Sequence, residues 1–265
     1  MNKPSLLVVK AGGNVIDHPE ALQRFLQDFA QLPHPKILVH GGGKIATRIG
    51  QQLNIASNYV NGRRITDDAA IDLVTMVYGG LINKKITAQL QALQCNAIGL
   101  SGADGNLVPA VKRPVQETDF GWVGDVLAQQ INTPLLQSLL AQQIVPVLAP
   151  LTHDGSGHML NTNADTIASA IAVALSAAYS VKLLYCFEKK GILQNVHNEE
   201  EIITRINRPV YEQLLTEGIL TDGIIPKIQN ALAAVEAGLE SVCIGHSDDL
   251  PANAGNTPAG TLITL

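Results

Sequence analysis

The chain has 265 residues, of which 46% are apolar and 15% are charged, and its formal net charge is −5. That length allows one large domain or two lobes around a sizeable core, and an acidic balance without a basic stripe excludes nucleic acids and membrane surfaces as main partners. The most apolar window, Thr166–Val181, is too short to span a membrane.

Apolar runs of strand length alternate along the chain with stretches of helical periodicity. The first strand, Leu6–Val9, is followed by apolar residues at helical spacing between Pro19 and Leu32. Further strands are predicted at Ile37–Val39, Ala97–Leu100, Ile144–Leu148, Val181–Cys186 and Ser241–Ile244. Further helices are predicted from a Thr66 cap to Leu90, from Asn163 to Leu175 and from Pro226 to Gly238. Residues 105–128 interrupt the alternation and suggest hairpins. This order predicts an α/β fold with a mainly parallel sheet between helix layers.

Three consecutive glycines, Gly41–Gly43, stand between a predicted strand and a helix. The free N–H groups of a helix start favour an anion, so this turn suits a phosphate or a carboxylate. It is not a P-loop, because the residue after Lys44 is Ile45 and offers no hydroxyl for magnesium. A dinucleotide pattern matches weakly, but no carboxylate follows at the required distance before Asp67, which disfavours an NAD(P)-binding oxidoreductase.

Polar residues gather where the predicted strands end, and ligands bind there in parallel sheets. Lys10 leaves the first strand just before Gly12–Gly13, which gives a second glycine turn with a lysine. Two such turns would surround phosphate oxygens with positive charge and N–H groups, as phosphoryl transfer requires. Arg64 suits a carboxylate, and Lys227 in a first helical turn suits an anion.

These motifs, in this order, resemble those of the amino-acid kinase family along nearly the whole chain. They are V-K-A-G-G at 9–13, H-G-G-G-K at 40–44, N-G-R-R-I-T at 61–66, G-L-S-G-A-D-G at 99–105, G-W-V-G-D-V at 121–126, N-T-N-A-D at 161–165 and D-G-I-I-P-K at 222–227. The resemblance implies a three-layer αβα sandwich forming a single domain, 1–265. Residues 1–150 would bind an N-acylated amino acid, and residues 151–265 would bind the nucleotide.

The resemblance also implies an activity and a set of roles. The enzyme would use ATP to phosphorylate the side-chain carboxylate of an N-acyl-L-glutamate, acetyl or succinyl, in arginine biosynthesis. Mg²⁺ would be held mainly by the nucleotide phosphates, without a dedicated metal site in the protein. Lys10, Lys227 and Asp165 would be catalytic. The acyl-amino acid would be bound by Gly41, Gly42, Gly43, Arg64 and Asn161, and the nucleotide by Gly12, Gly13, Glu188, Gly191 and Lys227.

Two departures from the family pattern leave alternatives open. Phe187-Glu-Lys-Lys-Gly191 stands where relatives read T-D-V-x-G, and Ala103 stands where they often have lysine. A kinase of an aminoadipate derivative shares the same motifs. A catalytically silent sensor of an amino-acid derivative is motivated by the Glu188–Lys190 change, although Lys10, Asp165 and Lys227 are all retained.

Further expectations concern structure, assembly and location. His40 is expected to be structural rather than catalytic. The three cysteines lie far apart in apolar stretches and should be buried, reduced thiols. The run Leu6–Val9 is too short for a signal peptide, so we expect a cytoplasmic protein. Nine residues precede Lys10, too few for the extra helix of arginine-inhibited hexameric relatives. We therefore expect a homodimer without arginine feedback, joined through the Asp67–Leu90 segment.

Overall fold

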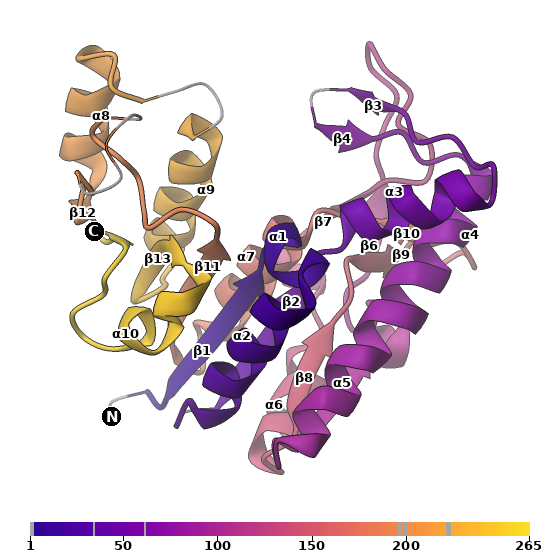
Figure 1. Ribbon diagram of the computed structural model, residues 1–265, viewed down its shortest axis with the longest axis horizontal. Helices are drawn as coiled ribbons and strands as arrows, with labels where there is room; N and C mark the ends of the chain where they lie inside the picture. Colours follow the sequence, from indigo (N-terminus) through magenta and orange to yellow (C-terminus); the bar gives the residue numbers. More distant parts are fainter. Residues whose placement is uncertain (1–2, 34, 61, 196–197, 199–200, 221–223) are drawn as a thin grey trace.

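The computed structural model describes residues 3–33, 35–60, 62–195, 198, 201–220 and 224–265 (Figure 1). Its centre is an eight-stranded sheet in the order β12-β14-β13-β11-β1-β2-β8-β5, in which β13 and β14 are antiparallel and the other neighbours are parallel. The strands, in that order, are Arg205–Ile206, Thr261–Ile263, Ser241–His246, Ser180–Phe187, Ser5–Ala11, Lys36–His40, Val145–Leu148 and Ala97–Leu100. All six predicted strands are present. The two short strands β12 and β14 were not predicted.

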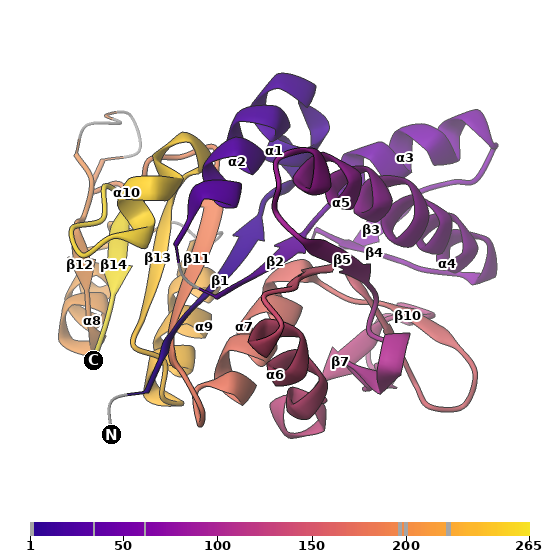
Figure 2. The ribbon, with the colours of Figure 1, turned by 90° about the horizontal axis from the view of Figure 1, so that it is seen from below.

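Helices cover both faces of this sheet, as Figure 2 shows. Along β1, Leu6 and Val8 enter one core and Leu7 and Val9 the other, because successive strand residues point to opposite faces. One layer comprises α6 (Thr133–Ala141), α7 (Ala164–Leu175), α8 (Arg208–Thr216) and α9 (Ile225–Glu236). The other comprises α1 (Gly13–Asp17), α2 (Pro19–Gln31), α3 (Gly43–Gln52), α4 (Asp68–Val74), α5 (Asn83–Ala92) and α10 (Leu250–Ala254). The predicted three-layer αβα sandwich is confirmed.

The predicted helix from Thr66 to Leu90 is present, with a different start and an irregular middle. α4 and α5 are joined by a π-helical segment, η1 (Thr75–Ile82). The N-cap is Asp67, whose side chain accepts the N–H of Ala70 at 2.8 Å, so the Thr66 cap was wrong. Thr66 is buried, and its carbonyl accepts the N–H of Trp122 at 2.7 Å. This pairing holds Thr66 in extended backbone and leaves the cap to its neighbour.

Three short hairpins among the described residues extend from the sheet, one in each of the stretches 59–64, 110–126 and 151–161. They pair β3 (Tyr59–Val60) with β4 (Arg63–Arg64), β6 (Ala110–Lys112) with β7 (Gly124–Val126), and β9 (Leu151–His153) with β10 (Met159–Asn161). The hairpin predicted within 105–128 is therefore confirmed. Single-turn 3₁₀ segments are Asp104–Asn106, Ala128–Gln130 and Ser247–Asp249. Residues before and after 150 share one sheet, since β1 pairs with β11 from Ser5↔Ser180 to Ala11↔Cys186.

Candidate functional site

Lys10 and Asp165 meet at the carboxyl end of the sheet. Lys10 lies near the end of β1 with 7% of its surface exposed, and its Nζ is 2.7 Å from Oδ1 of Asp165. Asp165 is in the first turn of α7, where the capping side chain of Asn163 accepts its backbone N–H at 2.7 Å. The Asn163 cap thus fixes the helix start that carries the carboxylate. Two of the three predicted catalytic residues are in direct contact.

Lys227 reaches the same place from the first turn of α9. Its Nζ lies 4.0 Å from the centre of the Phe187 ring, and that of Lys10 lies 4.8 Å from the same ring. Burial lowers the pKa of the Lys227 ammonium, and the charge of Lys10 adds to this, while Asp165 and Glu188 oppose it. Lys10, Asp165 and Lys227 therefore form one electrostatic group.

The two predicted glycine turns lie side by side. The N–H of Gly12 donates to the Cys186 carbonyl at 2.9 Å, and a Cβ at Gly12 would stand 2.9 Å from that oxygen. The N–H of Gly41 donates to the Ala11 carbonyl at 3.2 Å, and a Cβ there would lie 3.5 Å from the nitrogen of Gly13. The contact at Gly12 excludes a side chain there, whereas a Cβ at Gly41 would meet its neighbour at ordinary van der Waals distance.

The second turn opens α3 with an unusual backbone. Gly42 has φ +148°, and a Cβ there would lie 2.3 Å from Cδ1 of Ile82. The N-cap residues Gly12 and Gly42 have no side chain to offer to the N–H groups that begin α1 and α3. Such N–H groups favour an anion, which is the chemistry expected of both turns.

His40 contacts the backbone of this turn from the buried end of β2. It is fully buried, with Nδ1 2.8 Å from the Gly41 carbonyl and Nε2 3.2 Å from Nδ2 of Asn83. Burial lowers the pKa of the imidazole to about 4, so the ring is neutral near pH 7. Nδ1–H then donates to the carbonyl, and Nε2 accepts from Asn83. The geometry agrees with the structural role predicted for His40.

Arg64 joins the β3–β4 hairpin to the start of α3. Its guanidinium donates from Nη2 to the Gly43 carbonyl at 3.1 Å and to Thr47 Oγ1 at 2.9 Å, and from Nη1 to Ser57. It also lies over the Tyr59 ring, 4.9 Å from the ring centre. Arg64 is buried with 6% exposure, so this cation is fixed beside the glycine turn.

Asn161 ends β10, and its Nδ2 donates to Thr66 Oγ1 at 3.0 Å. It faces a cavity of about 420 Å³ between the glycine turns, the hairpins and the start of α7. The predicted residues that line this cavity are Lys10, Gly13, Gly41, Gly42, Gly43, Arg64, Asn161 and Asp165. A smaller space beyond Asp165 is lined by Lys227, Phe187, Tyr185 and Asn230. The predicted acyl-amino-acid residues therefore lie together, with Lys227 on the far side of Asp165.

Two predicted nucleotide-binding residues lie on the segment after β11. Glu188 is exposed and close enough to raise the pKa of Lys227. Gly191 is buried, and a Cβ there would lie 2.8 Å from Oγ1 of Thr261. It lines neither of the two spaces described above. Residues 221–223, which include the start of the D-G-I-I-P-K motif, and Asn61 lie outside the described residues.

Sequence reasoning did not select two residues that the structure adds to the site. Phe187 ends β11 and contacts both lysines, yet it reads as one more apolar strand residue. Arg113 lines the large cavity, and its Nε and Nη2 pair with Asp125, with Nε–Oδ distances of 3.1 and 3.2 Å. The sequence did hold a sign of this pair, because Arg113 and Asp125 carry opposite charges and both lie in the stretch 105–128, where hairpins are predicted.

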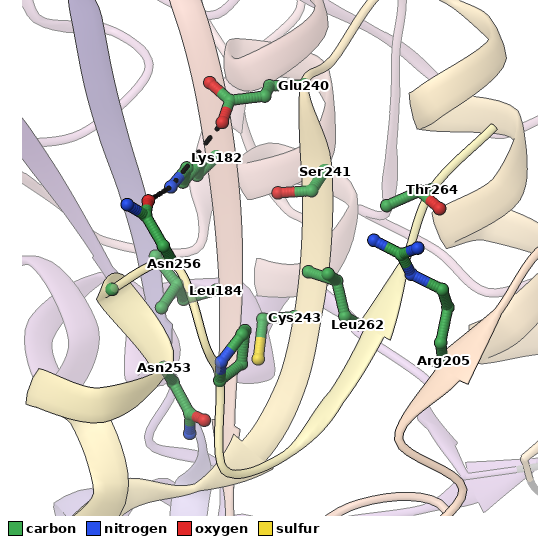
Figure 3. Close-up of a pocket in the computed structure, with 12 residues that line it drawn as sticks. Lys182, Leu184, Arg205, Glu240, Ser241, Cys243, Asn253, Asn256, Leu262 and Thr264 are labelled. Atoms are coloured by element: carbon green, nitrogen blue, oxygen red, sulfur yellow. Dashed lines mark hydrogen bonds and ion pairs between the residues drawn. The ribbon is translucent and has the colours of Figure 1, made fainter.

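A second cavity, of about 190 Å³, lies near the amino ends of β11 and β13 (Figure 3). Nζ of Lys182 is 3.5 Å from Oε1 of Glu240 and 3.4 Å from Oδ1 of Asn256, which the dashed lines mark. None of the predicted site residues lines it. We assign the site to the larger cavity because the glycine turns and the buried cations converge there.

The comparisons with known proteins agree with this geometry. The model of the amino acid kinase family matches residues 5–246, which is most of the chain. The chain belongs to the amino acid kinase family. It is 53% identical over 246 residues to the acetylglutamate kinase of Cytophaga hutchinsonii, covering 92% of each chain. It is 49% identical over 261 residues to that of Bacteroides fragilis, covering 98% of this chain and 97% of the relative.

Solved structures of this fold family superpose over nearly the whole chain. The protein smu.665 of Streptococcus mutans has a TM-score of 0.74 at 28% identity, with 98% of each chain covered. The N-acetylglutamate synthase of Neisseria gonorrhoeae has a TM-score of 0.81 at 21% identity, covering 100% of this chain and 60% of that one. The second likeness concerns the fold alone.

Membrane-spanning helices and metal-binding clusters are both absent from the described residues. None of the helices among them has the length and apolar character needed to cross a lipid bilayer. Within the same residues, no three His, Cys, Asp or Glu side chains come together as a metal-binding group. All three cysteines are buried and unpaired, as predicted.

Proposed function

We propose that the protein is an ATP-dependent kinase that phosphorylates the side-chain carboxylate of N-acetyl-L-glutamate, a step of arginine biosynthesis. The observation that carries this proposal is the Lys10–Asp165 ion pair, which lies with Lys227 beside a cavity lined by a glycine turn and Arg64. Relatives about half identical over nearly the full length are named acetylglutamate kinase, which supports the same substrate.

The proposed roles follow from charge and position. Arg64 and Asn161 bind the α-carboxylate of the acyl-amino acid, and the N–H groups of Gly42 and Gly43 receive the carboxylate that reacts. The N–H of Gly41 donates to the Ala11 carbonyl, so Gly41 contributes by allowing a close approach to the backbone. That carboxylate attacks the γ-phosphorus of ATP; a new O–P bond forms as the bond to the β–γ bridging oxygen breaks, and ADP leaves. Lys10 and Lys227 offset the negative charge on the transferring group and on the leaving oxygen.

ATP requires Mg²⁺, and the described residues that surround the site offer few free carboxylates to hold it. Asp165 is already paired with Lys10, and Glu188 faces the charge of Lys227. We therefore expect the ion to arrive with the nucleotide and to be held mainly by phosphate oxygens. Gly13 would donate its N–H to the phosphates, and Gly12, whose N–H donates to the Cys186 carbonyl, would let the nucleotide approach the backbone closely. Gly191 would act by allowing close packing at the edge of the nucleotide lobe, since a Cβ there would meet Thr261.

One specific observation favours an alternative substrate with a different acyl group. Arg113 lines the same cavity, and its Nη1 is buried without a hydrogen-bond partner among the described residues. A further carboxylate at the end of the acyl group, as in N-succinyl-L-glutamate, would give those N–H groups an acceptor. N-Acetyl-L-glutamate, in contrast, carries an uncharged methyl end.

One ADP-release assay tests these substrates together. MgATP would be supplied with N-acetyl-L-glutamate, N-succinyl-L-glutamate, N-acetyl-L-aminoadipate or free L-glutamate. We expect turnover with an N-acyl-glutamate and little with free glutamate, whose ammonium would meet the cationic cavity. Faster turnover of the aminoadipate derivative would replace the proposed substrate. Binding of an acyl-amino acid without ADP release would indicate a sensor.

We further propose that the protein is a cytoplasmic homodimer joined through the η1 segment. Met76 is 56% exposed, Leu81 in the same segment is 37% exposed, and Ile98 on the edge strand β5 is 36% exposed. Exposed apolar side chains on η1 and on the edge strand β5 favour a second copy as the partner. Light scattering should give twice the mass of 28.1 kDa, and Met76→Lys should shift it towards the monomer. A hexamer, or inhibition by arginine, would contradict the dimer without feedback.

A further inference from the structure

One aromatic ring contacts both lysines of the site. Nζ of Lys227 lies 4.0 Å and Nζ of Lys10 lies 4.8 Å from the centre of the Phe187 ring. Both distances are within the range at which an ammonium is attracted by the negative face of an aromatic ring. Phe187 stands in the segment that departs from the usual pattern of the family.

The ring itself is held from several sides. Phe187 is the last residue of β11, and its ring stacks with that of Tyr185 at 6.1 Å between centres and 21° between planes. A Cβ at Gly12 would lie 3.5 Å from its Cδ1, so the first glycine turn packs against it. Figure 1 shows the end of β11 between α9 and the α1 turn. The ring therefore occupies a fixed place between the two lysines and the turn.

The two ammonium groups need such a partner because they repel each other. Burial lowers the pKa of Lys227 and the charge of Lys10 adds to this, while the carboxylates of Asp165 and the exposed Glu188 oppose it. Asp165 lies 2.7 Å from Lys10, and its carboxylate is shared between the two cations. A further carboxylate would hold the lysines but would repel the incoming phosphates. An aromatic face attracts cations without a net charge, so it leaves the positive potential of the site largely intact.

We propose that Phe187 is a positioning residue for phosphoryl transfer. Its ring holds the ammonium groups of Lys10 and Lys227 in one place beside the first glycine turn. This inference rests on the proposed kinase activity for its effect on rate. Its effect on the lysines themselves can be measured without turnover.

The test compares variants with and without a ring. Phe187→Leu keeps an apolar side chain and removes the ring, Phe187→Met does the same with an unbranched chain, and Phe187→Tyr retains the ring. We expect the Leu and Met variants to lose kcat by about 5- to 30-fold, the size of a desolvated cation–π contact. KM for the acyl-amino acid should change less than about threefold, and the Tyr variant should stay within about threefold of wild-type kcat.

A matched control removes a ring beside a lysine far from the site. Phe29 is on α2, and Nζ of Lys36 lies 5.1 Å from the centre of its ring. Phe29→Leu should lower the melting temperature and leave kcat unchanged. Loss of kcat in Phe29→Leu equal to that in Phe187→Leu would show that any ring deletion is enough, and would overturn the proposal.

A titration separates positioning from mere packing. Because a ring favours the charged ammonium, removing it should lower the pKa of Lys227, and the alkaline limb of the kcat profile should move to lower pH by about half a unit or more. NMR of ¹³C-labelled lysines, with Lys227 assigned through Lys227→Arg, would report the same shift directly. An unchanged titration in both the Leu and Met variants would refute the proposal. If no substrate releases ADP, the kinase proposal fails while the NMR titration still decides this one.

Discussion

Lys10 and Asp165 form an ion pair, 2.7 Å from Nζ to Oδ1, that joins the end of β1 to the first turn of α7. The two residues come from distant parts of the chain and from different secondary-structure types. Their contact connects the strand-end chemistry of the N-terminal half to the helix start of the C-terminal half. Burial lowers the pKa of Lys227 and the carboxylate of Asp165 opposes this shift, so Asp165 serves both cations.

Asp165→Asn should therefore act on catalysis more than on substrate binding. The amide keeps the shape of the carboxylate but no longer holds Lys10 or offsets the charge of Lys227. We expect kcat to fall by roughly 100-fold, with a smaller change in KM for the acyl-amino acid, as expected also of Lys227→Ala. Steady-state kinetics on folded protein would measure this. Glu236→Gln removes an exposed ion pair with Arg208 and should leave kcat unchanged.

Arg64→Ala should mainly weaken substrate binding. A contact to the α-carboxylate is the same before and during transfer, so its loss raises KM. Removal of a desolvated charge pair should cost about 2–4 kcal/mol, or roughly 30- to 1,000-fold in kcat/KM. Loss of the bonds to Gly43 and Thr47 should also lower the melting temperature. Arg24→Ala, which changes an exposed arginine on α2, is the control. If Arg64→Ala lost kcat with an unchanged KM, the assigned role would be wrong.

Much of the fold could be predicted from the apolar runs that form the strands. Leu6–Val9 is buried on both faces, and such continuous apolar runs are typical of parallel strands covered on both sides. Helix starts followed from local chemistry at Asn163 and failed at Thr66. The sequence Thr66-Asp67 offers two adjacent capping residues, and the bond from Trp122 to the Thr66 carbonyl decides between them. That bond joins residues far apart in the chain, which local propensity does not report.

The candidate site likewise contains residues that the sequence could indicate and residues that only tertiary contacts reveal. Lys10 could be chosen because a charged residue directly after a buried strand needs a reason to be there. Arg64 and Asp165 are selected through the resemblance to the amino-acid kinase family. Phe187 could not be chosen, because an aromatic residue after an apolar strand is indistinguishable from the core. Its contacts with two lysines depend on how α9 packs beside β11. The burial of Gly191 against Thr261 is likewise a tertiary contact that spacing alone did not indicate.

Gly42→Ala should destabilise the protein, whereas Gly43→Ala should not. Gly42 has φ +148°, which L side chains rarely adopt, and its new Cβ would lie 2.3 Å from Ile82. Gly43 has a helical position and no atom within 4 Å of a new Cβ. We expect a loss of roughly 2–4 kcal/mol for the first variant, measured by urea unfolding. Equal stabilities for the two variants would contradict the described turn.

The buried His40 should make stability depend on pH. The pKa of His40 in the folded protein is about 4, whereas the pKa of an unfolded histidine is near 6.5. Between these values the unfolded chain binds more protons, so folding stability is fully present above pH 6.5 and is lost as the pH falls towards 4. The shift of about 2.5 units corresponds to roughly 3 kcal/mol. Urea unfolding at several pH values would measure it.

His40→Gln provides the matched control for this dependence. The amide is uncharged at every pH used and can still donate towards the Gly41 carbonyl and accept from Asn83. The variant should be less stable than the wild type at pH 7, because the packing of the ring is lost. Its stability should nevertheless fall less between pH 6.5 and 4, by about the amount assigned to His40. Parallel pH curves for the two proteins would show that other groups, and not this imidazole, carry the acid sensitivity.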